Sequence, residues 1–189
     1  IIMVWQGTKR ENCIFYKSLE DDNSEVVKLL TEFDASYGFI GNDDSIFYFQ
    51  TDLNAPCSKI IAIDIDNPGR DNWREVVAES TDNLESSQLM RDKIVLTYLH
   101  DASSRVIVFD LKDSSSEDFE LPGMGTVGGF GGRRENTERF FSFTGFTVPA
   151  ITYRHDFETG ETTVYNRSKV DFNSDNYTSK QIFYTSKDG

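Results

Sequence analysis

Cysteine, histidine and positive charge are all scarce in this sequence of 189 residues. The two cysteines, Cys13 and Cys57, lie far apart and form no CxxC pair, which excludes a disulfide scaffold and a cysteine-based zinc site and favours a reducing compartment. The two histidines, His100 and His155, belong to no HExxH or comparable metal-ligand spacing. We therefore predict neither a metal ion nor a cofactor.

The charge balance and the lack of long apolar runs exclude further classes. Lys and Arg number 19 against 32 Asp and Glu, so the net charge is −13, and such a chain repels nucleic-acid phosphates and anionic lipid surfaces. No apolar run reaches the length of about 18 residues that a membrane-spanning helix needs. Residues 1–5 are apolar, but they lack the basic lead and the length of a signal peptide. We expect the middle portion of a soluble, cytoplasmic polypeptide.

A repeat of 46 residues is the strongest pattern in the chain. Ser18, Asp64, Asp110 and Asp156 are 46 positions apart, and each lies in or at the end of a β-leaning run. The runs cover residues 14–19, 60–65, 106–111 and 152–157. A fixed period of this length indicates a repeat architecture.

Each repeat has enough β-leaning segments for four strands. A second stretch follows each of the last three runs, and two more precede it. The stretches that follow are 73–77, 119–121 and 162–165. The pairs that precede are 37–40 with 46–50, 88–90 with 94–99, and 126–130 with 140–143. Four-stranded units of about 40 to 50 residues are the blades of β-propellers. Residues 24–33 have helix-like apolar spacing, but their place in the repeat matches a fourth strand, so we predict a strand there.

The predicted fold class is all-β, a β-propeller fragment of about three and a half four-stranded blades. We predict trailing strands of a partial blade in residues 1–35, blades in 36–84, 85–124 and 125–173, and a strand that begins a further unit in 174–189. Propellers close with four to eight blades. A chain with fewer leaves open edges, so we expect a piece of a longer polypeptide.

The glycine-rich segment matches a dinucleotide motif only in part. Gly123, Gly125 and Gly128 fit GxGxxG, which needs a helix after it. The further glycines at positions 129, 131 and 132 disfavour a helix. A Gly-rich inner strand is the better interpretation.

The segment after Asp64 comes close to a calcium-binding loop. Asp64, Asp66 and Glu75 supply acids at positions 1, 3 and 12 of an EF-hand loop, and Gly69 stands at position 6. Position 5 is Pro68, which has no side-chain oxygen, and Asn-Pro-Gly is a strong turn signal. We predict a hairpin turn, with a calcium-binding β-module as a weaker alternative.

No reaction centre is evident from the residues alone. His100 precedes Asp101, and a carboxylate can orient an imidazole, but no GxSxG motif accompanies them. We predict that His100 ends a strand at a turn and that the polar clusters 21–25 and 114–118 are hairpin connections. Asn166 and Asn176 match the glycosylation motif, which is common by chance.

Several segments resemble the prolyl oligopeptidase family of serine peptidases. Six stretches are similar in order and spacing to the second half of that family's N-terminal propeller, and residues 183–189 resemble its junction with the peptidase domain. The six stretches are 31–37, 47–52, 72–77, 98–101, 128–131 and 143–151. The resemblance covers nearly the whole chain.

The resemblance implies a parent hydrolase in which a seven-bladed propeller caps an α/β-hydrolase domain with a Ser, Asp, His triad. The triad would cleave short peptides after proline, and this chain would cover and gate it while contributing no catalytic residue. In many members an Arg and a Cys of the propeller reach the substrate cavity. Trp5 and Thr8 stand at those positions here, so we assign no substrate-binding residue, and contacts from Trp5 to Arg10 stay open. The alternative is a non-catalytic propeller that binds other proteins.

Overall fold

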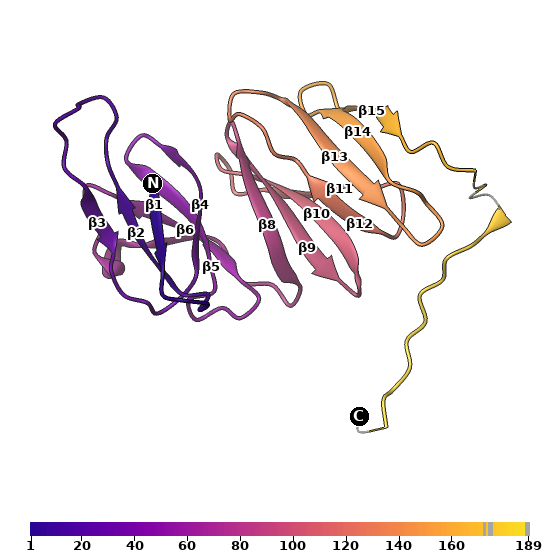
Figure 1. Ribbon diagram of the computed structural model, residues 1–189, viewed down its shortest axis with the longest axis horizontal. Helices are drawn as coiled ribbons and strands as arrows, with labels where there is room; N and C mark the ends of the chain where they lie inside the picture. The colour runs from indigo at the N-terminus through magenta and orange to yellow at the C-terminus, as the bar shows by residue number, and fades with distance from the viewer. Residues whose placement is uncertain (172, 174–175, 188–189) are drawn as a thin grey trace. The chain divides into compact units, whose positions relative to one another are not determined.

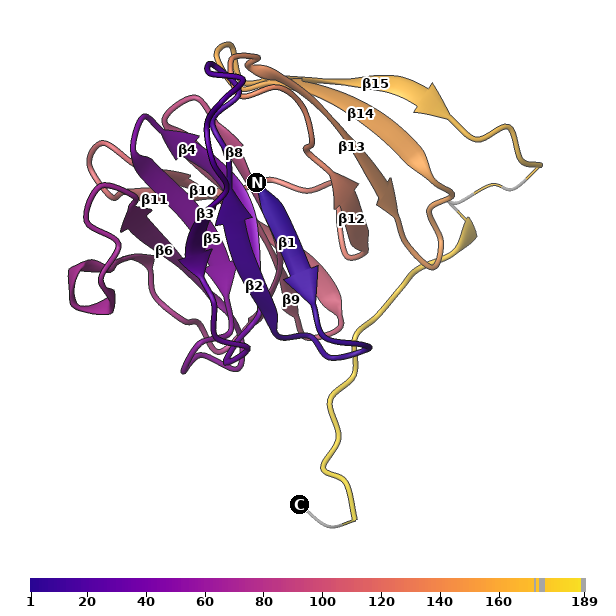
Figure 2. The ribbon, with the colours of Figure 1, turned by 60° about the vertical axis from the view of Figure 1, so that its left-hand side comes forward.

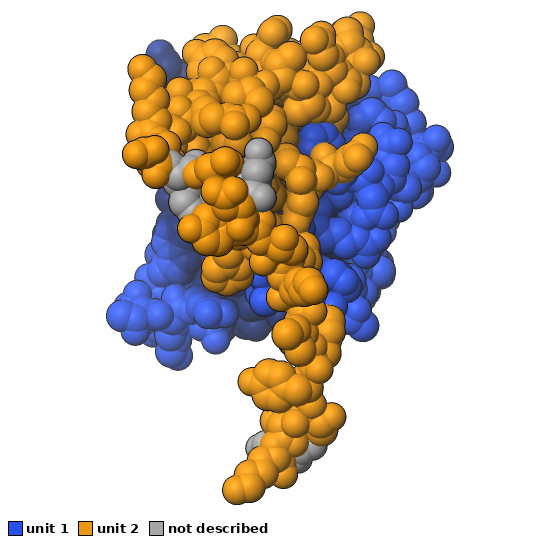
Figure 3. Space-filling model, turned by 90° about the vertical axis from the view of Figure 1, so that its right-hand side faces the viewer, with its two compact units in different colours: residues 1–119 blue, residues 120–189 orange. Residues whose placement is uncertain are grey.

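The computed structural model describes residues 1–171, 173 and 176–187, and it consists of antiparallel sheets (Figure 1). Contacts divide the chain into two units, residues 1–119 and 120–189, coloured blue and orange in Figure 3. Unit 1 holds one three-stranded and two four-stranded sheets, and unit 2 holds one four-stranded sheet. The sheets are β1 (Ile2–Trp5), β2 (Asn12–Tyr16) and β3 (Val27–Leu30); β4 (Tyr37–Asp43), β5 (Ile46–Thr51), β6 (Lys59–Asp64) and β7 (Arg74–Val77); β8 (Asn83–Met90), β9 (Lys93–His100), β10 (Ser103–Asp110) and β11 (Ser116–Phe119); and β12 (Thr126–Gly129), β13 (Glu138–Thr144), β14 (Ile151–Asp156) and β15 (Glu161–Arg167).

Within each sheet the strands are joined in chain order, and the 46-residue repeat marks one strand of each sheet. The four repeated runs are β2, β6, β10 and β14, and every one of them pairs with a strand on both sides. A strand in this position has its backbone groups bonded on both edges, which favours the β-branched residues found there. The all-β prediction is confirmed. The blade limits stay predictions, except that β8 begins at Asn83, before the start predicted at residue 85.

The segment with helix-like spacing is a strand, as predicted. Within residues 24–33, β3 pairs with β2, with Leu30 opposite Ile14. Leu30 is buried while Val27 is exposed. Residues Arg70–Asn72 form a 3-10 turn, and no helix in the described part of the chain has the length and apolar character that crossing a membrane requires.

The prediction for the hairpin after β10 was partly wrong. The strand expected at 119–121 is β11, Ser116–Phe119, so residues 116–118 belong to a strand rather than to a connection. This edge strand is mostly exposed and needs no apolar side chains. Asp118 instead holds Arg105 of β10, with Nε at 2.7 Å and Nη2 at 3.0 Å from its carboxylate oxygens.

The strand expected over 174–189 is not seen in the described residues of that range, 176–187. Residues 174, 175, 188 and 189 lie outside the described part of the chain. A strand needs a ladder of hydrogen bonds to a neighbour, and none of the described strands pairs with this segment. The side chains of Ile182, Phe183 and Tyr184 are exposed.

The sheet of β4–β7 is buried on both faces, which explains its continuous apolar runs. Side chains alternate between the faces of a strand, so Phe47 and Phe49 pack with Ile14 of the first sheet. Tyr48, between them, packs with Ile94 of the third sheet. Burying each such side chain contributes about 1.5–3 kcal/mol. Ile60 and Ala62 join Tyr48, whereas Ile61 and Ile63 join Phe47.

Asn12 connects the first sheet to the second. Its side-chain Nδ2 donates to the Tyr37 carbonyl at 3.0 Å, and its Oδ1 accepts from the Tyr37 amide at 2.7 Å. The backbone N–H of Asn12 donates to the Ala35 carbonyl at 3.1 Å. The Asn12 amide thus satisfies buried backbone groups at the start of β4 as another strand would.

The sheet of unit 2 has one buried face rich in aromatic rings. Alternate residues of β13 are buried, namely Arg139, Phe141 and Phe143. Phe141 stacks on Phe130 at 4.8 Å and on Tyr153 at 5.1 Å between ring centroids. Arg139 is the exception to this apolar pattern, because its guanidinium is buried among these residues.

Candidate functional site

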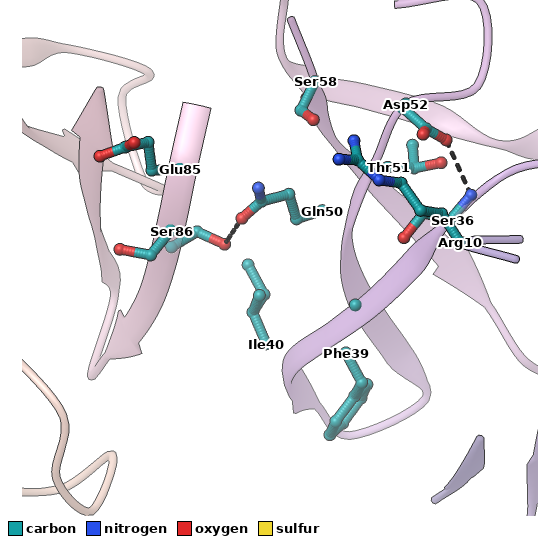
Figure 4. Close-up of a pocket in the computed structure, with 12 residues that line it drawn as sticks. Arg10, Ser36, Phe39, Ile40, Gln50, Thr51, Asp52, Ser58, Glu85 and Ser86 are labelled. Carbon is teal, nitrogen blue, oxygen red and sulfur yellow. Dashed lines mark hydrogen bonds between the residues drawn. The ribbon is translucent and has the colours of Figure 1, made fainter. Parts of the chain in front are cut away.

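A pocket of about 410 Å³ lies within unit 1, where residues of the second and third sheets meet the connection between β1 and β2 of the first sheet. Figure 4 shows it from the side, with Arg10 and Ser58 on one side and Glu85 and Ser86 on the other. We call it the Arg10 pocket. Its lining residues are Arg10, Ser36, Gly38, Phe39, Ile40, Gln50, Thr51, Asp52, Ser58, Glu85, Ser86 and Ser87.

Irregularities in two strands shape this pocket. The register of β4 shifts between Phe39 and Gly41, and that of β8 shifts between Leu84 and Ser86. Gly41 has φ +148°, and a Cβ there would lie 2.5 Å from Cδ2 of Leu89. Only glycine therefore permits the close approach of β4 to β8, and the pocket is lined by residues that precede this contact in both strands. Bulges of this kind often re-aim side chains next to binding sites.

Gln50 fixes the second sheet to the third at the centre of the pocket. Its Nε2 donates to the Leu84 carbonyl at 2.8 Å, and its Oε1 accepts from the Ser87 hydroxyl at 2.8 Å. Ser87 is buried and Gln50 is half-buried. Since both ends of the amide are engaged, the Gln50 side chain is held in one orientation. Its two hydrogen bonds also restrict the movement of β5 relative to β8.

The connection between β5 and β6 forms another wall. Asp52 accepts the Ser36 amide N–H at 2.7 Å, and the Leu84 amide donates to the Cys57 carbonyl at 2.9 Å. Ser58 has φ +67°, a conformation that costs a side-chain-bearing residue about 1–2 kcal/mol. Strained residues of this kind gather at functional sites, and here the strained serine lines the pocket.

Arg10 supplies the one positive charge among the lining residues. Its side chain points toward the space between Ser58 and Gln50 (Figure 4). The two other charged lining residues are Asp52 and Glu85. With hydroxyls, an amide, a cation and two carboxylates, the pocket is equipped to bind a polar ligand such as a peptide, and it contains no histidine or cysteine for a reaction of its own.

The positions singled out by the family resemblance lie close to this pocket in sequence but do not line it. Trp5 ends β1 and is half exposed, and Thr8 lies in the turn that follows. Arg10, at the end of the segment left open in the sequence, is the residue that reaches the pocket. That no substrate-binding residue can be assigned to Trp5 or Thr8 stays a prediction.

His100 ends β9 at a turn, as predicted, but its main partner was missed. Nδ1 lies 2.9 Å and 3.0 Å from the two carboxylate oxygens of Asp82, while Nε2 lies 3.4 Å from Asp101. The hydrogen bond to Asp82, followed by the charge of that carboxylate, raises the pKa of His100. No sequence signal joins residues 82 and 100, because the contact depends on the pairing of β8 with β9.

His155 has a structural environment. It is buried, its Nδ1 lies 2.7 Å from the Thr162 hydroxyl, and its ring meets Phe157 edge-on at 4.4 Å between centroids. Burial lowers the pKa of His155. A neutral imidazole in a packed hairpin fits this setting.

The segment after Asp64 is the predicted hairpin turn. Asp64 ends β6 and accepts the Asp66 amide at 3.1 Å, and the indole of Trp73 donates to the Pro68 carbonyl at 2.9 Å. Glu75 lies in β7 and forms an ion pair with Lys59 at 3.1 Å. The described residues contain no cluster of three acidic, histidine or cysteine side chains suited to a metal ion.

The glycine-rich segment contains the predicted strand, β12, which covers Thr126–Gly129. β12 pairs with β13, with Val127 opposite Phe143. Gly125, just before it, lies so close to the Thr144 carbonyl oxygen that no side chain would fit. Cys13 and Cys57 are both free thiols.

Comparisons with known proteins agree with one another. The family model described as prolyl oligopeptidase, N-terminal beta-propeller domain, matches residues 1–168. A prolyl endopeptidase of Elizabethkingia miricola is 32% identical over 178 residues, which are 94% of this chain and 25% of that protein. A structure from a structural and mechanistic analysis of two prolyl endopeptidases has TM-score 0.83 at 30% identity, covering 95% of this chain and 26% of that one. The apo structure of prolyl oligopeptidase B from Galerina marginata has TM-score 0.87 at 25% identity, covering 99% and 28%.

Two conclusions follow from these comparisons. The likeness in structure confirms that the chain is a β-propeller fragment. The chain also spans about a quarter of the length of the relatives that it matches.

The residues of the Arg10 pocket come from strands and connections of three sheets, so their grouping had no signal in the sequence.

Proposed function

The chain belongs to the prolyl oligopeptidase family, and from this premise we propose that it is the propeller portion of a serine-type prolyl oligopeptidase. The match of the family's propeller model to residues 1–168 carries the proposal, and the relation to prolyl endopeptidases supports it. The blades formed by β4–β7, β8–β11 and β12–β15, with β1–β3 as a partial blade, make up this portion. The parent polypeptide acts in the cytoplasm.

In this proposal the catalytic groups lie in an α/β-hydrolase domain of the same polypeptide. A serine attacks the carbonyl carbon of the proline residue, and the amine of the following residue leaves with a proton that a histidine delivers, while an aspartate orients the histidine and donors stabilise the oxyanion. This chain supplies none of these groups. Its two histidines are engaged elsewhere, His100 with Asp82 and His155 with Thr162.

The proposed role of the blades is to cover and gate that site. Blades packed through large apolar faces, such as those of the β4–β7 sheet, form a rigid cover. A rigid cover with a narrow entrance admits a short flexible peptide and excludes a folded protein, and it keeps bulk water from the reaction. The substrates are therefore short proline-containing peptides.

The test uses the full-length polypeptide that carries this chain. kcat/KM is measured for a short prolyl peptide, for the same bond in an exposed loop of a folded protein, and for that protein after it has been unfolded and cut into short fragments. We expect cleavage of the peptide and of the fragments, and negligible cleavage of the folded protein. The 189-residue chain alone is the matched control and should not cleave the peptide.

Other results separate the parts of the proposal. Equal cleavage of the folded protein and the peptide would show that the blades do not select by size. A full-length polypeptide that cleaves no prolyl peptide, and that lacks a GxSxG serine beyond this chain, would instead support a non-catalytic propeller scaffold.

A further inference from the structure

Arg10 brings a permanent positive charge into a pocket where the Gln50 amide and one oxygen of Asp52 are already engaged. Gln50 is held by Leu84 and Ser87, and one carboxylate oxygen of Asp52 is held by the Ser36 amide. Arg10 makes no hydrogen bond or ion pair with any other described residue. Its guanidinium therefore has all its donors available to a ligand.

The chemistry around Arg10 favours a carboxylate. A guanidinium binds a carboxylate through two parallel hydrogen bonds, which gives both affinity and orientation. The hydroxyls of Ser58 and Ser86 line the same pocket and can bond to a peptide backbone. A dianion such as phosphate is less suited, because Asp52 and Glu85 also line the pocket and the chain carries a net charge of −13.

The size of the pocket agrees with this ligand. Its volume of about 410 Å³ lies in the range of sites for small ligands, about 300–1,000 Å³. The half-buried side chains of Phe39 and Ile40 add apolar contact beside the polar groups. A pocket with this mixture holds one or two residues of a peptide.

We infer that the Arg10 pocket binds the carboxylate of a peptide, either the side chain of an acidic residue or the C-terminal carboxylate, away from the bond that is cleaved. The inference rests on the proposed function, which supplies the peptide. Arg10 is then a specificity residue that makes acidic peptides better substrates than neutral ones.

The experiment compares matched peptides on the full-length polypeptide. The peptides share one proline bond, carry Glu or Gln in turn at each position remote from it, and end in a free carboxylate or an amide. The variants are Arg10→Gln, Arg10→Lys and, as the control, Lys9→Gln, which changes the net charge equally but does not line the pocket.

We expect Arg10→Gln to raise KM for the peptides with the recognised carboxylate about tenfold, as the loss of a charge-assisted hydrogen bond predicts. kcat should stay within about twofold, because the inferred contact is to a carboxylate away from the bond that is cleaved. KM for the fully neutral peptide should not change, Lys9→Gln should have little effect, and Arg10→Lys should restore part of the affinity. The Glu and amide arms show which carboxylate is bound.

Two outcomes would overturn the inference and leave the proposed function intact. One is equal KM for acidic and neutral peptides in the unchanged protein, and the other is an equal loss in Arg10→Gln and Lys9→Gln. If no prolyl peptide is cleaved at all, the proposed function fails. Fluorescence anisotropy of labelled Glu and Gln peptides then tests whether the Arg10 pocket binds a carboxylate. Tighter binding of the Glu peptide that is lost in Arg10→Gln supports the Arg10 pocket, and equal binding refutes it.

Discussion

His100 carries a raised pKa because Asp82 bonds to its ring and stabilises the imidazolium. The folded protein therefore binds this proton more tightly than the unfolded chain, whose histidine titrates near 6.5. The stabilisation is fully present below that pH and is lost as the pH rises through the folded pKa. Asp82→Asn should bring the pKa of His100 back toward 6.5 in an NMR titration.

The control for this prediction is Asp101→Asn. Asp101 is a smaller contributor to the raised pKa than Asp82, so its removal should shift the titration less. His100→Gln assigns the signal, because His155 is the only other histidine. A His100 titration that is the same with and without the Asp82 carboxylate would contradict the assignment of Asp82 as the main partner.

Arg139 is a buried cation with incomplete hydrogen bonding. Nη1 donates to the Arg133 carbonyl at 2.8 Å, but Nε and Nη2 have no hydrogen-bond partner among the described residues. Burial lowers the pKa of Arg139. Replacing buried ion pairs by apolar side chains of similar volume is often stabilising by about 1–4 kcal/mol, because the charges no longer lose their hydration. An incompletely bonded buried guanidinium carries the same cost, so Arg139→Met should raise the urea midpoint of unfolding. Arg154→Met, which removes an exposed ion pair with Glu138, should change stability by less than about 1 kcal/mol. A lower midpoint in Arg139→Met would show that the guanidinium is well compensated.

Asn12 supplies buried hydrogen bonds between the first and second sheets. Asn12→Ala would leave the amide and the carbonyl of Tyr37 without their partner in a buried place. Each unsatisfied buried group costs about 1–3 kcal/mol, so we expect a loss of about 3 kcal/mol in the free energy of unfolding, measured by urea denaturation. Asn42→Ala, which removes an exposed bond to the Asp44 carbonyl, should cost less than about 1 kcal/mol. Equal effects of the two variants would refute this role.

The sequence predicted the strands whose side chains are buried and apolar. It did not predict strands that are held mainly by backbone hydrogen bonds. β6 and β10 have apolar residues at successive positions because both faces are buried, and their spacing was readable. β11 is an exposed edge strand, held by its backbone ladder and by Asp118, so its polar residues looked like a connection. Edge strands generally carry this weak signal.

The pocket was beyond prediction for a different reason. Its walls depend on bulges in β4 and β8 and on the bonds from Gln50 to the next sheet. These features arise when sheets pack, and no local pattern of residues encodes them. Only the segment that contains Arg10 could be named, and the family resemblance rather than composition pointed to it.

At the scale of the whole chain, the first sheet presents an unprotected edge. In β1, four consecutive apolar residues are exposed, from Met3 at 40% to Trp5 at 51%. Among the strands of the described residues, β1 pairs with β2 alone (Figure 2). Exposed apolar edge strands pair with other chains, and a charged residue on the edge prevents this.

The 189-residue chain should therefore associate through β1. In sedimentation velocity we expect the average mass to rise with concentration over the micromolar range, up to about 100 μM. Val4→Lys should shift the distribution toward the monomer. Val164→Lys is the matched control, because β15 is also an exposed edge strand but already carries Glu161 and Arg167 at its ends, so a further charge should change little. A chain that stays monomeric at every concentration, or that responds equally to both substitutions, would show that β1 is not the associating edge.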